Sequence, residues 1–564
     1  MNTKCSKCNN SFTIYDEDLV FLERISPTFS GNSFSIPPPR ECPSCREALR
    51  MAFRNEVQLF VRKCDRTGER LISMYPSDAG FPVYRHREWF KDENDSTVFG
   101  REYDQKRSIF EQLAEIQTLA PRFHVYNFQE ELDVNSQYTN CAGENKNCYL
   151  IFASGRNEQC LFGRYVNYCF NCVDTFFADK CRSCYESCDL GNCERVFFSN
   201  QCKDCSDSWF LYDCRGCHDC IGCAGLRQKS YCIFNEQLTR EKYEAKKIEL
   251  NLNSRSGIEN VRATFLGNVA KSPRRALHGE LNDSSVGDYI WSTKNCFHCF
   301  DSRNAEDCRY CTFFMDGKDS MDVYSWGEME LCYQISGGGS YGEYRSAFTA
   351  MSFGCKESYY LDHCTFCDHC FACVGLNRKS YCILNKQYSK TEYEKVVASI
   401  VTDMIKGKEW GEFFPASLAP IGYNHSVAQD FYPLNKEAAI ESGFRWSDFK
   451  SPPPQSKKIV EAKDLPDEFS SSDPEILDSV IRCASTGKLF KLVKAELDFY
   501  SEYNLPLPQL HPEERQKLRQ QSRNPRKIRQ CDCAECGQSI PTTFVTDKQL
   551  QILCDKCYQN NMHG

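Results

Sequence analysis

The sequence predicts a multi-domain, mainly β protein in which two copies of a small end module flank a duplicated, cysteine-rich β-solenoid with capping helices. Three observations predict this architecture: paired CxxC motifs near both ends of the chain, a long match between those ends, and cysteines that recur every twelve residues between them. The length of 564 residues also requires several domains, because single domains hold roughly 100–200 residues.

The composition narrows the class of protein. No apolar run is long enough for a membrane helix, and the first residues, MNTKCSKCNNSF, lack the apolar core of a signal peptide. We therefore expect a cytoplasmic protein without a membrane segment. In that reducing compartment, 38 cysteines indicate metal ligands or buried thiols rather than disulfides. The net charge of −8 excludes a generally basic nucleic-acid coat and leaves room only for a local basic patch.

Each end module contains two CxxC pairs. Such pairs, each on a tight turn, are typical of the four-thiolate zinc sites of zinc-ribbon and treble-clef-like modules. We therefore expect two Zn²⁺ ions, in sites that offer no open coordination position for catalysis. The predicted ligands are Cys5, Cys8, Cys42 and Cys45 at one end, and Cys533, Cys536, Cys554 and Cys557 at the other.

The two end modules are copies of each other. A shift that places Arg46 on Arg515 aligns PPPRECPSCREALRMAFRNE with PLPQLHPEERQKLRQQSRNP, and the match continues through both sites. Each module therefore had room for two metal sites and retained a different one. Other residues stand where ligands were lost. Thr67, Arg85 and Glu88 align with Cys536, Cys554 and Cys557, and Thr486 aligns with Cys8. Cys483 and His511 remain as donors of a possible degenerate third site.

Arginines recur at every fourth position beside both sites, which places each trio on one helical face. They are Arg46, Arg50 and Arg54 in the first copy, and Arg515, Arg519 and Arg523 in the second. Arginine suits bidentate contact with phosphate, so one interpretation is a nucleic-acid-binding ridge. The alternative is that these arginines are solvated or pair with carboxylates of the protein itself.

Between the end modules lies a second duplication, in which residues 214–237 match residues 364–387. Cysteines recur there at intervals of twelve residues, as in Cys148, Cys160, Cys172 and Cys184. A short fixed period with many aromatic residues predicts a β-solenoid, whose equivalent residues stack about 4.8 Å apart. Twelve residues are either one small coil or half of a larger one. The runs of CxxCxxCxxC are consistent with buried structural thiols, with zinc or with an iron–sulfur cluster.

The remaining segments divide the chain. Residues 101–122 are predicted to be helical, and a capping box of Ser389 and Glu392 opens a helix with an apolar stripe. A Pro/Ser/Asp-rich stretch is predicted to let the C-terminal module move. The predicted parts are the N-terminal zinc module (1–100), a helical connector (101–134), the first solenoid half with its helix (135–252), a connector (253–285), the second solenoid half with its helix (286–407), an aromatic segment without an assigned role (408–450), a linker (451–475) and the C-terminal zinc module (476–564).

The chain resembles a family of large, cysteine-rich zinc-ribbon proteins from candidate-phyla bacteria. The resemblance covers most of the length, through CPSCREALRMAFRNE, the GLxxKSYCI motifs, YPLNKEAAIESG and the ELDFY…LPLPQLHPEER block. Members similar to this chain often carry cysteines at the positions of Thr67, Arg85 and Glu88. Some carry a CoA-transferase label, but no nucleotide-binding signature supports it here. The resemblance implies no particular activity.

These features favour a non-enzymatic zinc protein that contacts RNA or DNA through the arginines of its end modules. One alternative is a scaffold with purely structural zinc that binds an acidic protein partner. Another is a metal or redox enzyme that uses the cysteine ladder. The sequence contains no Ser/His/Asp set, Gly-rich phosphate loop or HExxH motif that would support an enzyme.

Overall fold

The computed structural model describes all residues except 128–131, 339–340, 457, 470–473, 546–549 and 564. The chain forms two compact units, and each unit joins segments that are distant in sequence. Unit 1 contains Met1–Tyr126 and Leu277–Phe449, and unit 2 contains Asn127–Ala276 and Lys450–Gly564. Each unit therefore combines one end module with the cysteine-rich repeat that lies far from it along the chain.

The repeat of unit 2 is a stack of parallel strands, which we call the first ladder. Residues pair with the residue twelve positions later, as in Ile151 with Gly163 and Val173 with Tyr185. The antiparallel strand β19 (Glu236–Gln237) closes the stack. Its parallel strands are β9 (Thr139–Asn140), β10 (Tyr149–Phe152), β11 (Leu161–Asn167), β12 (Val173–Asp179), β13 (Tyr185–Gly191), β14 (Glu194–Phe197), β15 (Asn200–Lys203), β16 (Ser206–Trp209), β17 (His218–Ile221) and β18 (Ser230–Ile233).

The repeat of unit 1, the second ladder, follows the same plan. Its register departs from twelve residues at two places: the first step is eleven, which pairs Gly279 with Ile290, and a later step is fourteen, which pairs Tyr333 with Ala347. The strand β32 (Lys386–Gln387) closes it as β19 closes the first ladder. The other strands are β21 (Gly279–Glu280), β22 (Val286–Trp291), β23 (Phe297–Arg303), β24 (Met321–Tyr324), β26 (Tyr333–Ser336), β28 (Ala347–Ala350), β29 (Tyr359–Asp362), β30 (Phe371–Val374) and β31 (Cys382–Ile383), with a separate pair β25 (Met329–Glu330) and β27 (Glu343–Tyr344).

Both ladders advance in steps of three residues. Almost every third residue has a left-handed backbone, as at Cys141, Glu144 and Asn147, with φ between 53° and 56°. Two positions before each left-handed residue, a side chain points inward and is buried, as at Cys148 and Ile151. Since residues pair at an offset of twelve, four such triplets separate a residue from its partner on the next strand. Among the described ladder residues, no left-handed position holds valine, isoleucine or threonine, whose branched Cβ disfavours that conformation.

The interior of each ladder is filled mainly by cysteine and small apolar side chains. Cys160, Cys172, Cys184 and Cys214 are fully buried, and none of the described cysteines forms a disulfide. Among the described residues, the ladder cysteines form no group whose ligand atoms converge on one point. The structure therefore favours buried structural thiols over zinc or an iron–sulfur cluster in the ladders.

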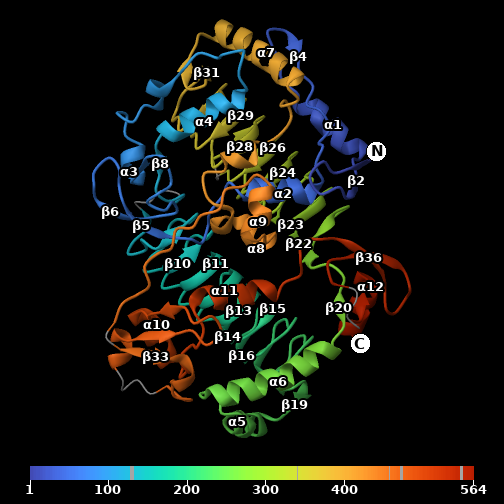
Figure 1. Cartoon of the computed structure of the whole chain (residues 1–564). Coiled ribbons are helices and arrows are strands. Elements are labelled where there is room, and N and C mark those ends of the chain that lie inside the picture. Colours follow the sequence, from blue (N-terminus) through green and yellow to red (C-terminus); the bar gives the residue numbers. More distant parts are fainter. Residues whose placement is uncertain (128–131, 339–340, 457, 470–473, 546–549, 564) are drawn as a thin grey trace. The chain divides into compact units, whose positions relative to one another are not determined.

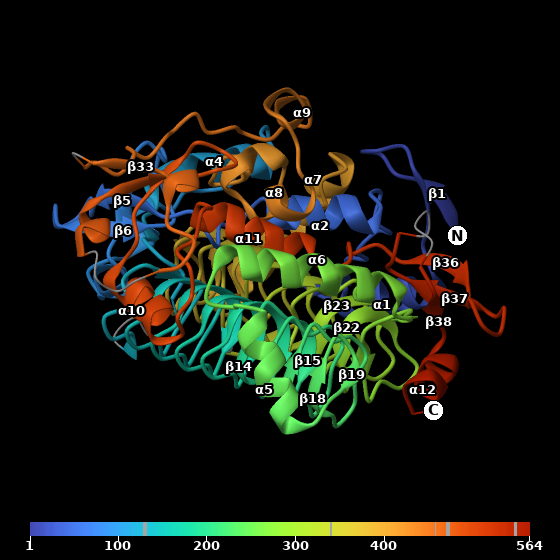
Figure 2. The same ribbon diagram turned by 90° about the horizontal axis from the view of Figure 1, so that it is seen from below.

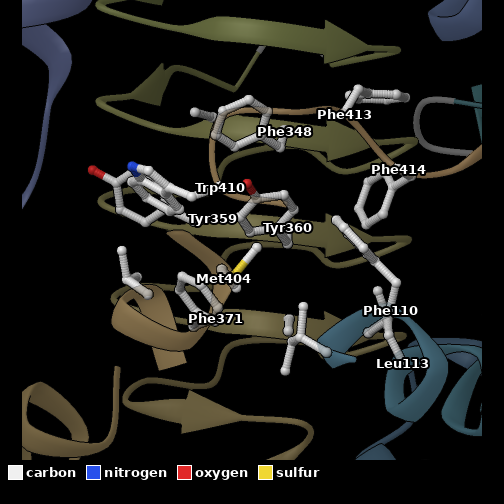
Figure 3. Packing of buried hydrophobic residues seen from close by; sticks show 14 of the residues in the cluster. Phe110, Leu113, Phe348, Tyr359, Tyr360, Phe371, Met404, Trp410, Phe413 and Phe414 are labelled. Atoms are coloured by element: carbon white, nitrogen blue, oxygen red, sulfur yellow. The ribbon is translucent and has the colours of Figure 1, made fainter. Parts of the chain in front are cut away.

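In unit 1, the outer face of the second ladder is covered by the N-terminal module and by residues after the ladder. Figure 3 shows Phe348, Tyr360 and Phe371 on strands β28 to β30, facing residues of other segments. The covering elements include α4 (Ile109–Leu119) and α7 (Lys390–Lys406). The helix predicted over 101–122 is confirmed only from Ile109 to Leu119, because residues 101–108 form no helix, and the capping box at Ser389 is confirmed. Trp410, Phe413 and Phe414 belong to this core, which gives the aromatic segment a structural role.

The N-terminal module itself alternates short hairpins with helices, and α2 lies beside β24 and β26 (Figure 1). Smaller elements of unit 1 after α7 are α8 (Val427–Phe431) and α9 (Lys436–Glu441). The elements of the module besides α4 are β1 (Asn2–Lys4), β2 (Ser11–Thr13), α1 (Asp16–Ile25), β3 (Thr28–Phe29), β4 (Asn32–Ser33), α2 (Pro43–Met51), β5 (Phe60–Lys63), β6 (Arg70–Ser73), β7 (Val83–Tyr84), α3 (His86–Trp89), η1 (Ser96–Phe99) and β8 (Arg122–Phe123).

In unit 2, the predicted connector and part of the predicted linker belong to the core. Helices α5 (Arg240–Glu249) and α6 (Arg255–Lys271) run beside β14 to β18 (Figure 2), and Phe265 packs on Phe210 at 5.7 Å between ring centroids. In the predicted linker, β33 (Ile459–Glu461) pairs with β34 (Val480–Arg482), and Ala462 and Leu465 are buried. Residues 459–465 of the predicted linker are therefore packed within unit 2. The other elements are β20 (Arg274–Arg275), β35 (Leu489–Phe490), α10 (Lys494–Glu502), α11 (Pro512–Gln521), β36 (Arg529–Asp532), β37 (Ser539–Thr542), β38 (Ile552–Leu553) and α12 (Asp555–His563).

Candidate metal centres and the arginine helices

The N-terminal cysteines converge because a tight turn meets a helix N-terminus. Cys5 and Cys8 lie on the turn between β1 and β2, where Asn9 has a φ of 59° and donates its N–H to the Cys5 carbonyl at 3.0 Å. Cys42 caps α2, whose first residue is a proline, and Cys45 lies in its first turn. The Cys42 N–H donates to the Cys5 Sγ at 3.2 Å, which fixes the helix start against the turn.

The C-terminal cysteines repeat this geometry. Cys533 and Cys536 lie on the turn between β36 and β37, where Gly537 has a φ of 72° and donates its N–H to the Cys533 carbonyl at 3.0 Å. Cys554 directly precedes α12, and Cys557 lies in its first turn. The Cys554 N–H donates to the Cys533 Sγ at 3.3 Å, which matches the contact in the first cluster.

Each group of four sulfur atoms has the spacing of a tetrahedral zinc site. Within each cluster, all four Sγ atoms lie within 4.8 Å of one another. The separation is 3.8 Å between the sulfurs of Cys8 and Cys42 and between those of Cys536 and Cys554. A Zn–S bond of about 2.3 Å in a tetrahedron places sulfurs about 3.8 Å apart, so both clusters fit a divalent metal ion held by four thiolates.

The surroundings favour one thiolate in each cluster, at Cys42 and Cys533, whereas hydrogen bonds within the clusters and burial raise the pKa of Cys45 and Cys557. A hydrogen bond from the Cys45 thiol, assisted by the backbone N–H of Cys45, lowers the pKa of Cys42 to about 5. Burial opposes ionisation of Cys533, but backbone N–H groups of Cys536, Cys554 and Glu535 outweigh it and lower its pKa to about 6. Thiolates are the form that binds metal.

The degenerate sites retain the turn and lack a ligand cluster. In the C-terminal copy, the His511 N–H donates to the Cys483 Sγ at 3.3 Å, as Cys42 does to Cys5. However, the His511 ring accepts through Nδ1 from the Glu513 N–H at 3.2 Å, so it caps α11. Among the described residues, only the two four-cysteine clusters bring three or more potential ligands together, and the possible third site is not supported.

In the second N-terminal site, ion pairs occupy the place of the lost ligands. The Arg85 N–H donates to the Cys64 Sγ at 3.4 Å, as Cys554 does to Cys533. The Arg85 guanidinium pairs with Glu69 at 3.1 Å, and Glu88 pairs with Lys91 at 2.8 Å. The fold of the module is therefore retained at this site without a cluster of thiols.

The six predicted nucleic-acid-binding arginines are buried rather than displayed. Their side chains are at most 8% exposed. The prediction of an accessible arginine ridge is therefore wrong for Arg46, Arg50, Arg54, Arg515, Arg519 and Arg523. Each trio faces the ladder of its own unit, and the alternative interpretation, pairing with the protein's own carboxylates, is confirmed.

One ladder aspartate in each unit receives two of these arginines. In unit 1, Asp322 accepts from the Nε of Arg46 at 2.8 Å and pairs with the Nη2 of Arg50 at 3.1 Å. In unit 2, Asp174 accepts from Arg515 and pairs with the Nη1 of Arg519 at 2.8 Å. Both aspartates are fully buried at left-handed positions, with φ of 59° and 55°.

These two aspartates are equivalent in the duplicated ladders. Residues 214–237 match residues 364–387 at an offset of 150. The step from Tyr333 to Ala347 is fourteen residues where the first ladder has twelve, so the offset is 148 before that step. An offset of 148 places Asp174 on Asp322. Neither aspartate was among the residues predicted from the sequence. The sequence feature that could have identified them is an aspartate within an apolar strand, in Val-Asp-Thr-Phe-Phe and Met-Asp-Val-Tyr.

The third arginine of each trio differs between the copies. Arg523 pairs with Asp189 at 3.1 Å and lies 3.9 Å from the centre of the Phe177 ring. Arg54 instead pairs with Glu56 at 2.7 Å, on the segment that follows α2. The pairing of the first two arginines is therefore the shared feature.

The comparisons with known proteins add no assignment: no protein-family model matches the chain, and no curated protein matches it. In the part of the chain that the structure describes, none of the helices has the length and apolar character needed to cross a bilayer.

Proposed function

We propose that this protein is a non-enzymatic scaffold with one structural Zn²⁺ in each four-cysteine cluster. The sulfur geometry of the two clusters carries the proposal, because four thiolates at tetrahedral spacing suit zinc and leave no coordination position for a substrate. Zinc binding of this kind stabilises a folded module by about 10 kcal/mol or more. The family resemblance through the quoted motifs agrees with zinc-ribbon modules.

The positions of the arginine trios and of the ladder cysteines support the scaffold part of the proposal. The arginines that were predicted to bind phosphate form ion pairs between an end module and a ladder, and the ladder cysteines are buried inside the ladders. Contact with RNA or DNA through the arginine trios loses its support for this reason. We further propose that both ladders are β-solenoids with one twelve-residue coil per turn, a rigid platform for the modules.

Metal analysis of the purified protein tests the proposal. We expect two zinc atoms per chain by inductively coupled plasma mass spectrometry, and one in each of the variants Cys5→Ser and Cys533→Ser. Cys64→Ser, which alters a cysteine outside both clusters, is the matched control and keeps two. Bound iron with visible absorbance, or a folded protein without metal, would falsify the proposal.

A further inference from the structure

A cavity of about 820 Å³ lies in unit 1, next to the N-terminal cluster, and no role assigned so far accounts for it. Cys8, Cys45 and Leu49 line it, together with residues of the segment from Lys408 to Phe444. The volume lies within the range of about 300–1,000 Å³ that is typical of ligand pockets.

The apolar floor of the cavity is fixed in place before any ligand binds. Phe413 and Phe414 are buried and pack on Phe53, with ring centroids 5.2 and 5.6 Å away. Figure 3 shows Phe414 beside Phe110, which also lines the cavity, and Phe413 next to Phe414. A floor held by neighbouring aromatic rings has little conformational entropy to lose on binding.

Further aromatic side chains line the cavity. Tyr423 packs on Phe444 at 4.6 Å between ring centroids, and the Tyr432 hydroxyl donates to Glu47 at 2.6 Å. Aromatic faces attract cations as well as apolar groups, so this lining suits a ligand that carries both.

The charges around the cavity favour a cationic ligand. Arg40 is already paired with Glu412 at 2.6 Å, and Lys7 donates to the Ser442 carbonyl at 2.7 Å. Among the described residues, the Glu41 carboxylate has no hydrogen-bond or ion-pair partner, and Lys408 is an exposed cation. With zinc bound, four thiolates around a divalent ion add two negative charges beside the cavity, which makes its field negative.

We propose that this cavity binds a short segment of a partner protein in which a lysine or arginine stands next to apolar side chains. The apolar side chains contact Phe110, Phe413 and Leu49, and the cation lies toward Glu41 and the sulfurs of Cys8 and Cys45. The inference rests on the proposed zinc scaffold for the charge of the cluster, and it gives that scaffold a binding site and a class of partner.

Selection from a phage-displayed library of random seven-residue peptides tests the proposal with full-length protein. We expect enrichment of peptides that combine lysine or arginine with leucine, phenylalanine or tryptophan. Binding of the enriched peptides, measured by fluorescence anisotropy, is expected to weaken at least about tenfold in Leu49→Arg and in Leu434→Arg, which fill and obstruct the cavity from different elements. Glu41→Gln is expected to weaken binding less, and Glu111→Gln, which changes an exposed glutamate that does not line the cavity, is the matched control.

Three outcomes would overturn the proposal: no enrichment, enrichment of acidic peptides, or unchanged affinity for both cavity variants. Zinc content is measured on the same samples, so failure of the cavity with two zinc atoms present is distinguishable from failure of the proposed metal sites.

Discussion

At the scale of single residues, the buried ion pairs explain why arginines recur in both end modules. A fully buried aspartate is costly unless cations and hydrogen-bond donors compensate its charge, and Asp174 and Asp322 each receive two guanidinium groups. Losing one arginine of such a set leaves an undercompensated charge inside the protein. The duplicated modules therefore retained these arginines while their metal ligands diverged.

Removal of the shared acceptor should destabilise the unit that contains it. Asp322→Asn is expected to lower the free energy of unfolding of unit 1 by about 3–5 kcal/mol, because two buried arginines lose their counter-charge. Asp174→Asn should have the same effect on unit 2. Hydrogen exchange by mass spectrometry measures both. Glu306→Gln, which breaks an exposed pair with Lys294, is the control and should cost less than about 1 kcal/mol.

A buried histidine in unit 1 should make stability depend on pH. Burial, assisted by His86 and Arg85, lowers the pKa of His124 to about 3, so the ring stays neutral in the folded state. Below pH 6.5 the unfolded chain takes up a proton that the folded chain does not, and stability falls as pH decreases toward 3. At pH 5 the loss is about 2 kcal/mol relative to pH 7.5.

Thermal unfolding of His124→Asn beside the parent protein isolates this effect. Asparagine retains an acceptor for the His86 N–H without titrating. The melting temperature of the variant should fall less between pH 7.5 and pH 5, whereas acid release of zinc affects both proteins equally. Equal pH dependence in the two proteins would contradict the assignment.

At the scale of elements, two local structures recur in the protein. One is the tight turn that carries the first cysteine pair of each cluster, and the other is the three-residue backbone step of the ladders. The turn is retained with four thiols at two sites and without a ligand cluster at the other two, as the contacts of Cys64 and Cys483 show. The triplet turns left-handed at its third residue and points its first side chain inward. Local backbone geometry determines both structures. Their side chains can therefore be replaced only by residues that fit the same backbone conformation.

Reintroducing cysteines should restore a metal site in the second N-terminal turn. The combined variant Thr67→Cys, Arg85→Cys and Glu88→Cys recreates the ligand set around Cys64, and we expect three zinc atoms per chain in place of two. Adding Cys64→Ser to this variant should return the content to two. A folded variant that still holds two zinc atoms would show that the turn is no longer suited to metal.

The triplet geometry predicts where the ladders reject branched side chains. Lys180 is exposed and left-handed, with a φ of 52°, whereas the exposed Arg182 is not left-handed. Lys180→Val should therefore destabilise the first ladder by about 1–2 kcal/mol, and Lys180→Gly should be tolerated. Arg182→Val is the comparison, and equal costs for the two valine variants would refute the rule. Thermal unfolding provides the readout.

At the scale of the whole molecule, each metal cluster belongs to one unit. Unit 1 joins the N-terminal module to the second ladder, and unit 2 joins the C-terminal module to the first. Loss of one cluster should therefore affect distant parts of the sequence selectively. We expect Cys5→Ser to increase hydrogen exchange in α2 and in β24 and β26, and Cys533→Ser to do so in β20 and β36 to β38. Uniform loosening of both units in either variant would contradict this division.

The sequence by itself determined the features that depend on local spacing. The CxxC pairs identified both four-cysteine clusters, the twelve-residue interval matches the strand register, and Ser389 with Glu392 marked the start of α7. Only the tertiary structure decided which ladder each module packs on, and therefore that the arginines are internal. A helical period shows that Arg46 and Arg50 share a face, but it does not show what covers that face. Their partner Asp322 is more than 270 residues away, and only folding brings these charges together.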